Sequence, residues 1–229
     1  HLMIKNISNL GDAAVYCDFG SEVNQQINSN VINYFNKITE LRDLKKIEGI
    51  TNLTPSYNKL IVSFDLTLAN FKKIKKFIED LEISIQTNIK SKKVSIPICT
   101  EDEFALDFQR LNKLTNKSKE EILELFLSKE YFCYMTGFIA GMPFLGDIDQ
   151  KIQCPRLETP RVKVPEGSVG LTEQFTNIYT SESPGGWNII GNTPLKIFNK
   201  NNELNPILIN PGDKIKFYQI NKKEYDNWK

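Results

Sequence analysis

The chain has 229 residues, of which 40% are hydrophobic and 25% are charged, and these are the proportions of an ordinary globular protein. Its 29 lysines and arginines nearly balance its 28 aspartates and glutamates, so the formal net charge is only +1. Without a long-range positive field, neither nucleic acid nor a membrane surface is expected as a partner. The length suffices for one large domain or two ordinary ones.

Histidine and cysteine usage excludes several kinds of catalytic site. The single histidine, His1, precedes Met3 together with Leu2, and we interpret both residues as remnants of an expression vector. On that interpretation, Ser-His-Asp triads, Cys-His pairs and histidine-containing zinc sites are excluded, and no metal site is expected. The cysteines form no C-x-x-C pair; they are Cys17, Cys99, Cys133 and Cys154. Scattered cysteines, with no apolar leader and no long apolar run, predict a cytoplasmic protein with reduced thiols.

The first part of the chain alternates between strand and helix periods. The predicted elements are a strand that ends at Phe19, a helix over 22–41, strands over 47–55 and 59–66, and a helix over 69–82. The second helix carries a row of lysines opposite its apolar side, which we interpret as a solvated face. This order predicts an N-terminal α+β domain over residues 3–90, with the helices on one face of a mostly antiparallel sheet.

The second part, residues 94–229, is predicted to be a mainly-β domain. Its predicted elements are a strand at 94–98, a weak helix over 104–111, a helix from the Ser118–Glu121 capping box to about Lys129, a strand over 131–138, and closing strands at 195–198, 206–209 and 214–220. Between them, residues 137–194 hold most of the glycines and prolines. Such dense spacing predicts tight turns between very short strands, which is typical of a β-barrel.

Two arginines in this turn-rich segment are the first candidates for a site. Arg156 and Arg161 each follow a proline that stiffens the backbone. Two guanidinium groups held in this way suit a carboxylate or a phosphate. The alternative is that each arginine pairs with a nearby acid, such as Glu158 or Glu166, or caps carbonyl groups at strand ends. No P-loop, dinucleotide-binding or nucleophile-elbow motif is present to suggest a conventional nucleotide or hydrolase site.

Two neighbouring turns have a functional and a structural interpretation. The segment Gly167-Ser168-Val169-Gly170 offers backbone N–H groups and a hydroxyl that suit an anion, or it is a plain hairpin turn. Trp187 follows Gly185-Gly186, where it either walls a pocket or belongs to the core.

Four sequence motifs, taken in order, resemble one protein family. They are G-F-x-x-G-x-x-[FY]-L-G at 137–146, P-R-x-x-x-P-R at 155–161, V-P-x-G-S-V-G at 164–170 and S-P-G-G-W-x-x-I-G-x-T-P at 183–194. Together they resemble the B subunit of bacterial ATP-dependent 5-oxoprolinase. This family is also labelled allophanate hydrolase subunit 1 or KipI-like sensor-kinase inhibitor, and the resemblance extends along nearly the whole chain.

The resemblance implies an α+β N-terminal domain followed by a mainly-β, cyclophilin-like barrel domain. It implies a non-autonomous enzyme subunit that acts with a C subunit of related barrel fold and an A subunit. The complex opens 5-oxo-L-proline to L-glutamate and uses ATP, and the isolated chain is expected to be inactive. One alternative is a subunit of an allophanate hydrolase or of a urea carboxylase-type carboxyltransferase.

A second alternative is an inhibitor that binds a sensor histidine kinase through an apolar patch containing Phe144, Leu145 and Trp187. Prolyl isomerase activity would follow from the fold alone, and fold does not determine function.

From this resemblance, we expect a substrate pocket at the junction with the partner subunit. Its expected side chains are Arg156, Arg161, Ser168, Thr176, Tyr179 and Trp187, and its expected backbone turns are at Gly141, Gly146, Gly167, Gly170, Gly185 and Gly186. The arginines suit a carboxylate or a phosphorylated intermediate, and the region of Ser168 suits an oxyanion. No catalytic residue is assigned. The chain departs from the family pattern at Ala140 and Thr180, where proline is usual, at Phe175, where glutamine is usual, and at Asn177, where glycine is usual.

Overall fold

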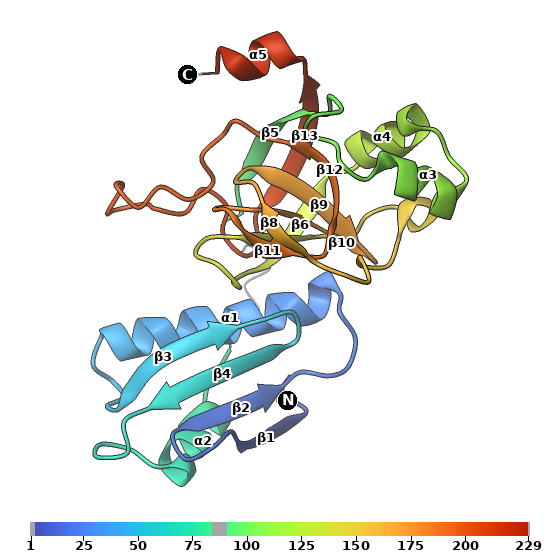
Figure 1. Cartoon of the computed structure of the whole chain (residues 1–229). Helices are drawn as coiled ribbons and strands as arrows, with labels where there is room; N and C mark the ends of the chain where they lie inside the picture. The colour runs from blue at the N-terminus through green and yellow to red at the C-terminus, as the bar shows by residue number, and fades with distance from the viewer. Residues whose placement is uncertain (1–2, 84–90, 229) are drawn as a thin grey trace. The chain divides into compact units, whose positions relative to one another are not determined.

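The computed structural model describes residues 3–83 and 91–228. The chain divides into two compact units, residues 1–90 and residues 91–229. Figure 1 labels their helices and strands. Within the described ranges, no helix is both long enough and apolar enough to cross a membrane.

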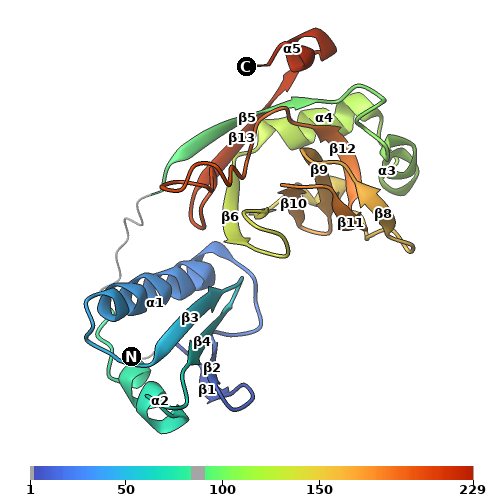
Figure 2. The same cartoon turned by 60° about the vertical axis from the view of Figure 1, so that its left-hand side comes forward.

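The first unit is an antiparallel sheet with two helices on one face. Its elements are β1 (Asn6–Asn9), β2 (Ala14–Asp18), α1 (Gln25–Asp43), β3 (Ile50–Pro55), β4 (Lys59–Phe64) and α2 (Phe71–Glu79). The strand order is β1-β2-β4-β3. Val31 of α1 and Ile74 of α2 share one buried cluster with Val15 and Leu60 of the sheet, so both helices cover the same face, as Figure 2 shows.

The sequence patterns of the first unit correspond to these elements with small shifts. The predicted strand that ends at Phe19 is β2. The chain before it forms β1, which pairs with β2 in a hairpin that turns near Gly11, whose φ is 61°. Helix α1 begins at Gln25 because the side chain of Asn24 accepts the N–H of Ile27 at 2.9 Å. Two of the lysines on α2 form exposed ion pairs with acids one turn ahead, which fits a solvated face.

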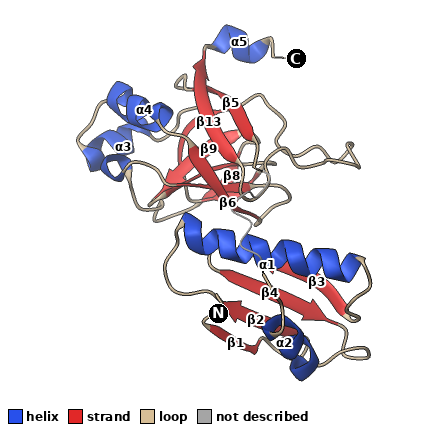
Figure 3. Cartoon of the chain, turned by 180° about the vertical axis from the view of Figure 1, so that it is seen from behind, coloured by secondary structure: helices blue, strands red, loops and turns tan. Residues whose placement is uncertain are grey.

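The second unit is built around a closed β-barrel. Its elements are β5 (Lys93–Cys99), α3 (Phe108–Thr115), α4 (Lys119–Ser128), β6 (Tyr131–Thr136), β7 (Pro143–Gly146), η1 (Gln150–Ile152), β8 (Arg161–Val164), β9 (Ser168–Thr172), β10 (Phe175–Ile178), β11 (Ser183–Gly185), β12 (Asn188–Asn192), β13 (Lys214–Ile220) and α5 (Lys222–Asp226). Among the described residues, seven strands close in the order β10-β7-β6-β13-β5-β12-β9. Figure 3 shows them in red, beside α3 and α4. The predicted barrel is confirmed.

Side chains of the barrel strands alternate between two apolar clusters. Leu145, Ile178 and Ile190 belong to the large core of the unit. Their neighbours along the strands therefore point to the opposite face, and Ile189 packs there with Val164 of β8 in a second, smaller cluster. The two-stranded sheet β8–β11 thus covers part of the outer wall of the barrel.

Two predictions for the second unit are wrong. Of the three expected closing strands, only 214–220 is a barrel strand, because the other two segments meet only in the single bridge between Phe198 and Ile207. The weak helix begins at Phe108 instead of Phe104, because residues 101–105 form a turn in which Glu101 accepts backbone N–H groups.

Candidate functional site

Arg161 is held in a bidentate ion pair with a buried carboxylate. Its Nη1 and Nη2 donate to Oδ2 and Oδ1 of Asp107 at 2.9 Å and 2.6 Å. Asp107 is only 5% exposed, and its Oδ2 also accepts the backbone N–H of Ile189 at 2.6 Å. Asp107 occupies the N-cap position of α3, but its side chain caps no helix N–H. It instead ties β8 and β12 to the start of α3.

The alternative interpretation, in which an acid neutralises each arginine, therefore describes Arg161. The acid lies 54 residues away in sequence and is neither of the nearby glutamates. Sequence spacing could not find it, since Asp107 stands in no recognisable motif.

Arg156 lies near this pair but keeps its guanidinium group available. The side chain is exposed, and a Cβ placed on Gly186 would lie 3.6 Å from its Nε and Nη2. Within residues 3–83 and 91–228, no carboxylate lies at ion-pairing distance from Arg156. Arg110 of α3, which the sequence did not suggest, donates to the carbonyl of Arg156 at 3.3 Å and to Oδ1 of Asn188 at 3.1 Å. Arg110 therefore braces the turn that carries Arg156.

One group of charged side chains, the arginine cluster, consists of Arg110, Arg156, Arg161 and Asp107. Three guanidinium groups and one carboxylate leave it with an excess of positive charge. Because Asp107 is fully occupied by Arg161 and Ile189, that excess belongs to Arg110 and Arg156, of which Arg156 is the more exposed. The cluster is thus suited to a small anion.

Tyr179 lies under the arginine cluster as a buried phenol. It is 1% exposed, and burial raises the pKa of the phenol above its ordinary value. The side chain of Asn177 and the backbone N–H of Trp187 act in the opposite direction. So do the positive charges of Arg156 and Arg161, which places both guanidinium groups within electrostatic reach of the phenol. A Cβ on Gly185 would collide with the phenol of Tyr179, one on Gly186 would lie 3.6 Å from the Arg156 guanidinium group, and Gly185 pairs with Arg161 between β11 and β8. The structure therefore brings Arg156, Arg161 and Tyr179 around one turn, which Trp187 directly follows.

The other two expected residues are Thr176, whose hydroxyl is committed elsewhere, and Ser168, whose backbone N–H is. Thr176 is buried in β10, and its hydroxyl donates to the carbonyl of Gly170 at 2.8 Å. The N–H of Ser168 donates to Pro165 at 3.2 Å, and that of Gly170 donates to Oδ1 of Asn177 at 3.1 Å. The backbone N–H groups of this turn are therefore not free to bind an oxyanion, and the hairpin interpretation describes them.

Trp187 packs beside the second, smaller cluster on the outer wall, through its contact with Phe144. It is 8% exposed, and its ring meets Phe144 edge to face with centroids 5.7 Å apart. Leu145, the third member of the expected apolar patch, lies in the large core of the unit. The patch expected for a kinase inhibitor is therefore wrong, because two of its three side chains are buried.

The glycines expected at the site allow close approach of other groups. A Cβ on Gly185 would collide with the phenol of Tyr179, and one on Gly170 would lie 2.8 Å from Oδ1 of Asn177. The remaining expected glycines are Gly141 and Gly167 at positive φ, Gly146 at the end of β7, and Gly186 beside Arg156.

Two of the residues that depart from the family pattern contact each other. The hydroxyl of Thr180 donates to the carbonyl of Ala140 at 2.7 Å, so the two positions where proline is usual are hydrogen-bonded together. The ring of Phe175 lies 5.9 Å from that of Tyr134. Asn177 lies in β10 rather than in a turn. Its buried Nδ2 has no hydrogen-bond acceptor in the described residues, although it faces the phenol of Tyr179 closely enough to influence its pKa.

Comparison with known proteins identifies the family. The family "Carboxyltransferase domain, subdomain C and D" matches residues 5–209. The 5-oxoprolinase B subunit of Bacillus subtilis (strain 168) is 34% identical over 235 aligned residues, which cover 97% of this chain and 96% of that protein. The chain belongs to the family of 5-oxoprolinase B subunits.

Solved structures share the fold of this member of the 5-oxoprolinase B subunit family. A conserved uncharacterized protein from Pyrococcus horikoshii is 34% identical, with a TM-score of 0.57, and the match covers 96% of this chain and 100% of that one. The Kluyveromyces lactis urea carboxylase is 19% identical, with a TM-score of 0.79. That match covers 96% of this chain but 22% of the urea carboxylase, and it shows the fold alone.

Proposed function

We propose that this chain is the B subunit of an ATP-dependent 5-oxoprolinase, which opens 5-oxo-L-proline to L-glutamate together with a C subunit and an A subunit. The observation that carries the proposal is the 34% identity to the 5-oxoprolinase B subunit of Bacillus subtilis over 97% of this chain. In this role the chain supplies one part of a site that the other subunits complete. The isolated chain is therefore inactive. A cytoplasmic location belongs to the same proposal, and the free, buried cysteines are consistent with it.

Within this proposal, Arg156 binds the carboxylate of 5-oxo-L-proline. Arg161 cannot do so without abandoning Asp107, whereas Arg156 is exposed and unpaired within the described ranges. Arg161 is then a positioning residue, because it fixes the start of α3 and with it Arg110. The phenol of Tyr179 stays protonated near neutral pH, since burial raises its pKa, and it closes the inner side of the arginine cluster.

ATP is a co-substrate of the proposed complex. The turn that most resembles a phosphate-binding loop has its N–H groups already occupied: Gly167 donates to Tyr179 at 2.7 Å, and Ser168 donates to Pro165 at 3.2 Å. This turn therefore does not fit the triphosphate, and the proposal leaves ATP binding to another subunit. The cyclophilin-like character of the barrel stays a prediction.

The proposal is tested by mixing this chain with its candidate C and A subunits and measuring ATP hydrolysis with and without 5-oxo-L-proline. We expect substrate-dependent hydrolysis only in the complete mixture. Arg156→Ala should lower kcat/KM for 5-oxo-L-proline about 10- to 150-fold, as expected when a charge-assisted hydrogen bond worth about 1.5–3 kcal/mol is lost. Lys151→Ala removes an exposed cation outside the arginine cluster and serves as the matched control. Turnover by the isolated chain would contradict the divided site.

The carboxyltransferase part of a urea carboxylase is a second candidate, and the 27% identity to the "Putative urea carboxylase" of Emericella nidulans over 128 residues favours it. The same mixture, assayed with urea in place of 5-oxo-L-proline, separates the two. Stimulation of ATP hydrolysis by urea alone would replace the first proposal with the second.

A further inference from the structure

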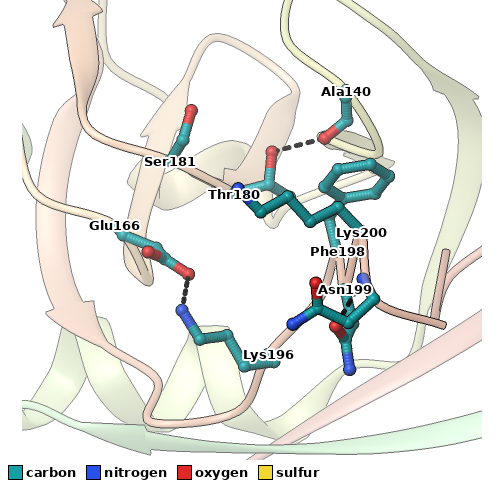
Figure 4. A pocket seen from close by; sticks show the side chains of 9 residues that line it. Ala140, Glu166, Thr180, Ser181, Lys196, Phe198, Asn199 and Lys200 are labelled. Atoms are coloured by element: carbon teal, nitrogen blue, oxygen red, sulfur yellow. Dashed lines mark hydrogen bonds and ion pairs between the residues drawn. The ribbon is translucent and has the colours of Figure 1, made fainter. Parts of the chain in front are cut away.

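A cavity of about 640 Å³ opens in the barrel unit, and none of the six expected site side chains lines it. It lies between the turn that carries Ala140, the segment Thr180-Ser181 and the loop 196–201, as Figure 4 shows. Small-molecule sites typically enclose about 300–1,000 Å³, so the volume is suited to a ligand.

The walls of this cavity are fixed by specific contacts. The hydroxyl of Thr180 donates to the carbonyl of Ala140 at 2.7 Å. Gly141 has a φ of +68°, and a Cβ there would lie 2.9 Å from Cδ2 of Phe198. Only glycine therefore lets the Phe198 ring seat against the turn. Ile207 pairs with Phe198 in a β-bridge and anchors the loop. The ring thus forms a fixed apolar wall.

Two side-chain acceptors that line the cavity are already occupied. Glu166 is paired with Lys196 at 2.5 Å, and Oδ1 of Asn199 accepts the backbone N–H of Asn201 at 3.1 Å. Within residues 3–83 and 91–228, no ion pair or side-chain hydrogen bond engages the ammonium group of Lys200. In Figure 4, the Lys200 side chain lies between Phe198 and Thr180.

Three donors that line the cavity have unused hydrogen-bonding capacity. Besides the Lys200 ammonium group, they are the Nδ2 amide of Asn199 and the hydroxyl of Ser181, neither of which is engaged in the described part of the chain. Donors and one unpaired positive charge facing an apolar wall complement a ligand with an anionic, planar acceptor group on an apolar body.

We propose that this cavity binds an organic carboxylate, with the carboxylate on Lys200 and Asn199 and the apolar body against the ring of Phe198. The cavity shares no lining residue with the arginine cluster. The carboxylate site is therefore independent of the proposed 5-oxoprolinase function, and either can fail without the other.

The test uses benzoate as the probe, benzamide as its neutral counterpart of the same shape, and inorganic phosphate as an anion without an apolar body. Each is titrated into the full chain labelled with ¹⁵N, and amide chemical shifts give both the dissociation constant and the place of binding. We expect benzoate to shift the amides of Ser181, Phe198 and Lys200 in a saturable way, and benzamide and phosphate to bind at least about tenfold more weakly.

Charge variants then locate the interaction. Lys200→Gln should weaken benzoate binding about three- to tenfold, because it removes the unpaired ammonium group. Glu166→Gln should strengthen it about two- to fivefold, because it frees Lys196 from its ion pair. The matched controls are Lys223→Gln and Glu120→Gln, which change the net charge equally at exposed positions outside the cavity.

Several results would overturn the proposal. They are no saturable shift up to about 10 mM benzoate, an affinity that benzamide or phosphate equals, and control variants that change binding as much as Lys200→Gln and Glu166→Gln do. All these substitutions replace exposed side chains, so the variants should fold, and the dispersed spectrum of each one verifies this directly.

Discussion

Removing the guanidinium group of Arg161 is expected to destabilise the barrel unit strongly. Arg161→Ala leaves the carboxylate of Asp107, which is 5% exposed, with only the backbone N–H of Ile189 as a partner. Breaking a buried ion pair from one side typically costs about 3–5 kcal/mol. Because the Arg161 side chain is 27% exposed, water reaches the vacated space, and we expect the lower end of that range, about 3 kcal/mol.

Tryptophan fluorescence during urea unfolding measures this loss. Both tryptophans, Trp187 and Trp228, lie in the second unit, so the signal reports that unit alone. With a urea slope of about 2 kcal/mol per M, a loss of about 3 kcal/mol lowers the midpoint by about 1.5 M. Lys163→Ala is the matched control on the same strand. Its ion pair with Glu182 is 74% and 56% exposed at the two side chains, and its removal should cost less than about 0.5 kcal/mol.

A double variant separates lost charge pairing from lost packing. Asp107→Asn combined with Arg161→Ala removes the stranded charge, so we expect it to recover at least about 1 kcal/mol relative to Arg161→Ala alone. If Arg161→Ala unfolds within about 0.5 kcal/mol of the unmodified chain, or if the double variant recovers nothing, then the pair does not hold α3 to the barrel and the positioning role assigned to Arg161 is lost.

Three further outcomes are expected. Gly185→Ala should lower the urea midpoint of the barrel unit, because its Cβ would collide with the phenol of Tyr179, and an unchanged midpoint would mean that the contact relaxes freely. Burial raises the pKa of Cys17 to about 12 from 9.0, so the folded state holds a proton that the unfolded state releases. The contribution of the Cys17 thiol to the free energy of unfolding should therefore be fully present below pH 9. Above pH 9 it should fall by up to about 1.4 kcal/mol per pH unit. In Cys17→Ala, the free energy of unfolding, measured by circular dichroism, should fall less steeply with pH. Equal pH dependence in both proteins would contradict this prediction. Ser118→Ala removes the capping box with Glu121 and should cost about 1 kcal/mol in the same unfolding assay, whereas no loss would show that α4 does not need its cap.

Local signals in the sequence predicted a large part of the fold. The density of glycine and proline over 137–194 indicated short strands and tight turns, and β7 to β12 lie in that segment. The Ser118–Glu121 capping box is present at the start of α4, because both of its hydrogen bonds join residues three apart. Such features depend on neighbours in sequence, which a single chain displays directly.

The features that were missed depend on contacts between distant residues. Asp107 and Arg161 are 54 positions apart, so nothing in the spacing of either reveals that one neutralises the other. The same holds for Arg110, which supports Arg156 through a carbonyl rather than through a motif. The cavity beside Lys200 depends on the conformation of a loop that was expected to form strands. Sequence reasoning found the arginines but could not tell which of them is free.

The pairing of β13 has a consequence for biosynthesis. Residues 214–220 run parallel to β5 and also pair with β6, so this one strand bridges the two strands that are made first in the barrel unit. While a ribosome is still releasing these residues, β5 and β6 expose unsatisfied backbone edges that invite pairing with other chains. Nascent chains stopped short of residue 214 should therefore aggregate. A chaperone that covers these strand edges would prevent this until translation has passed residue 214.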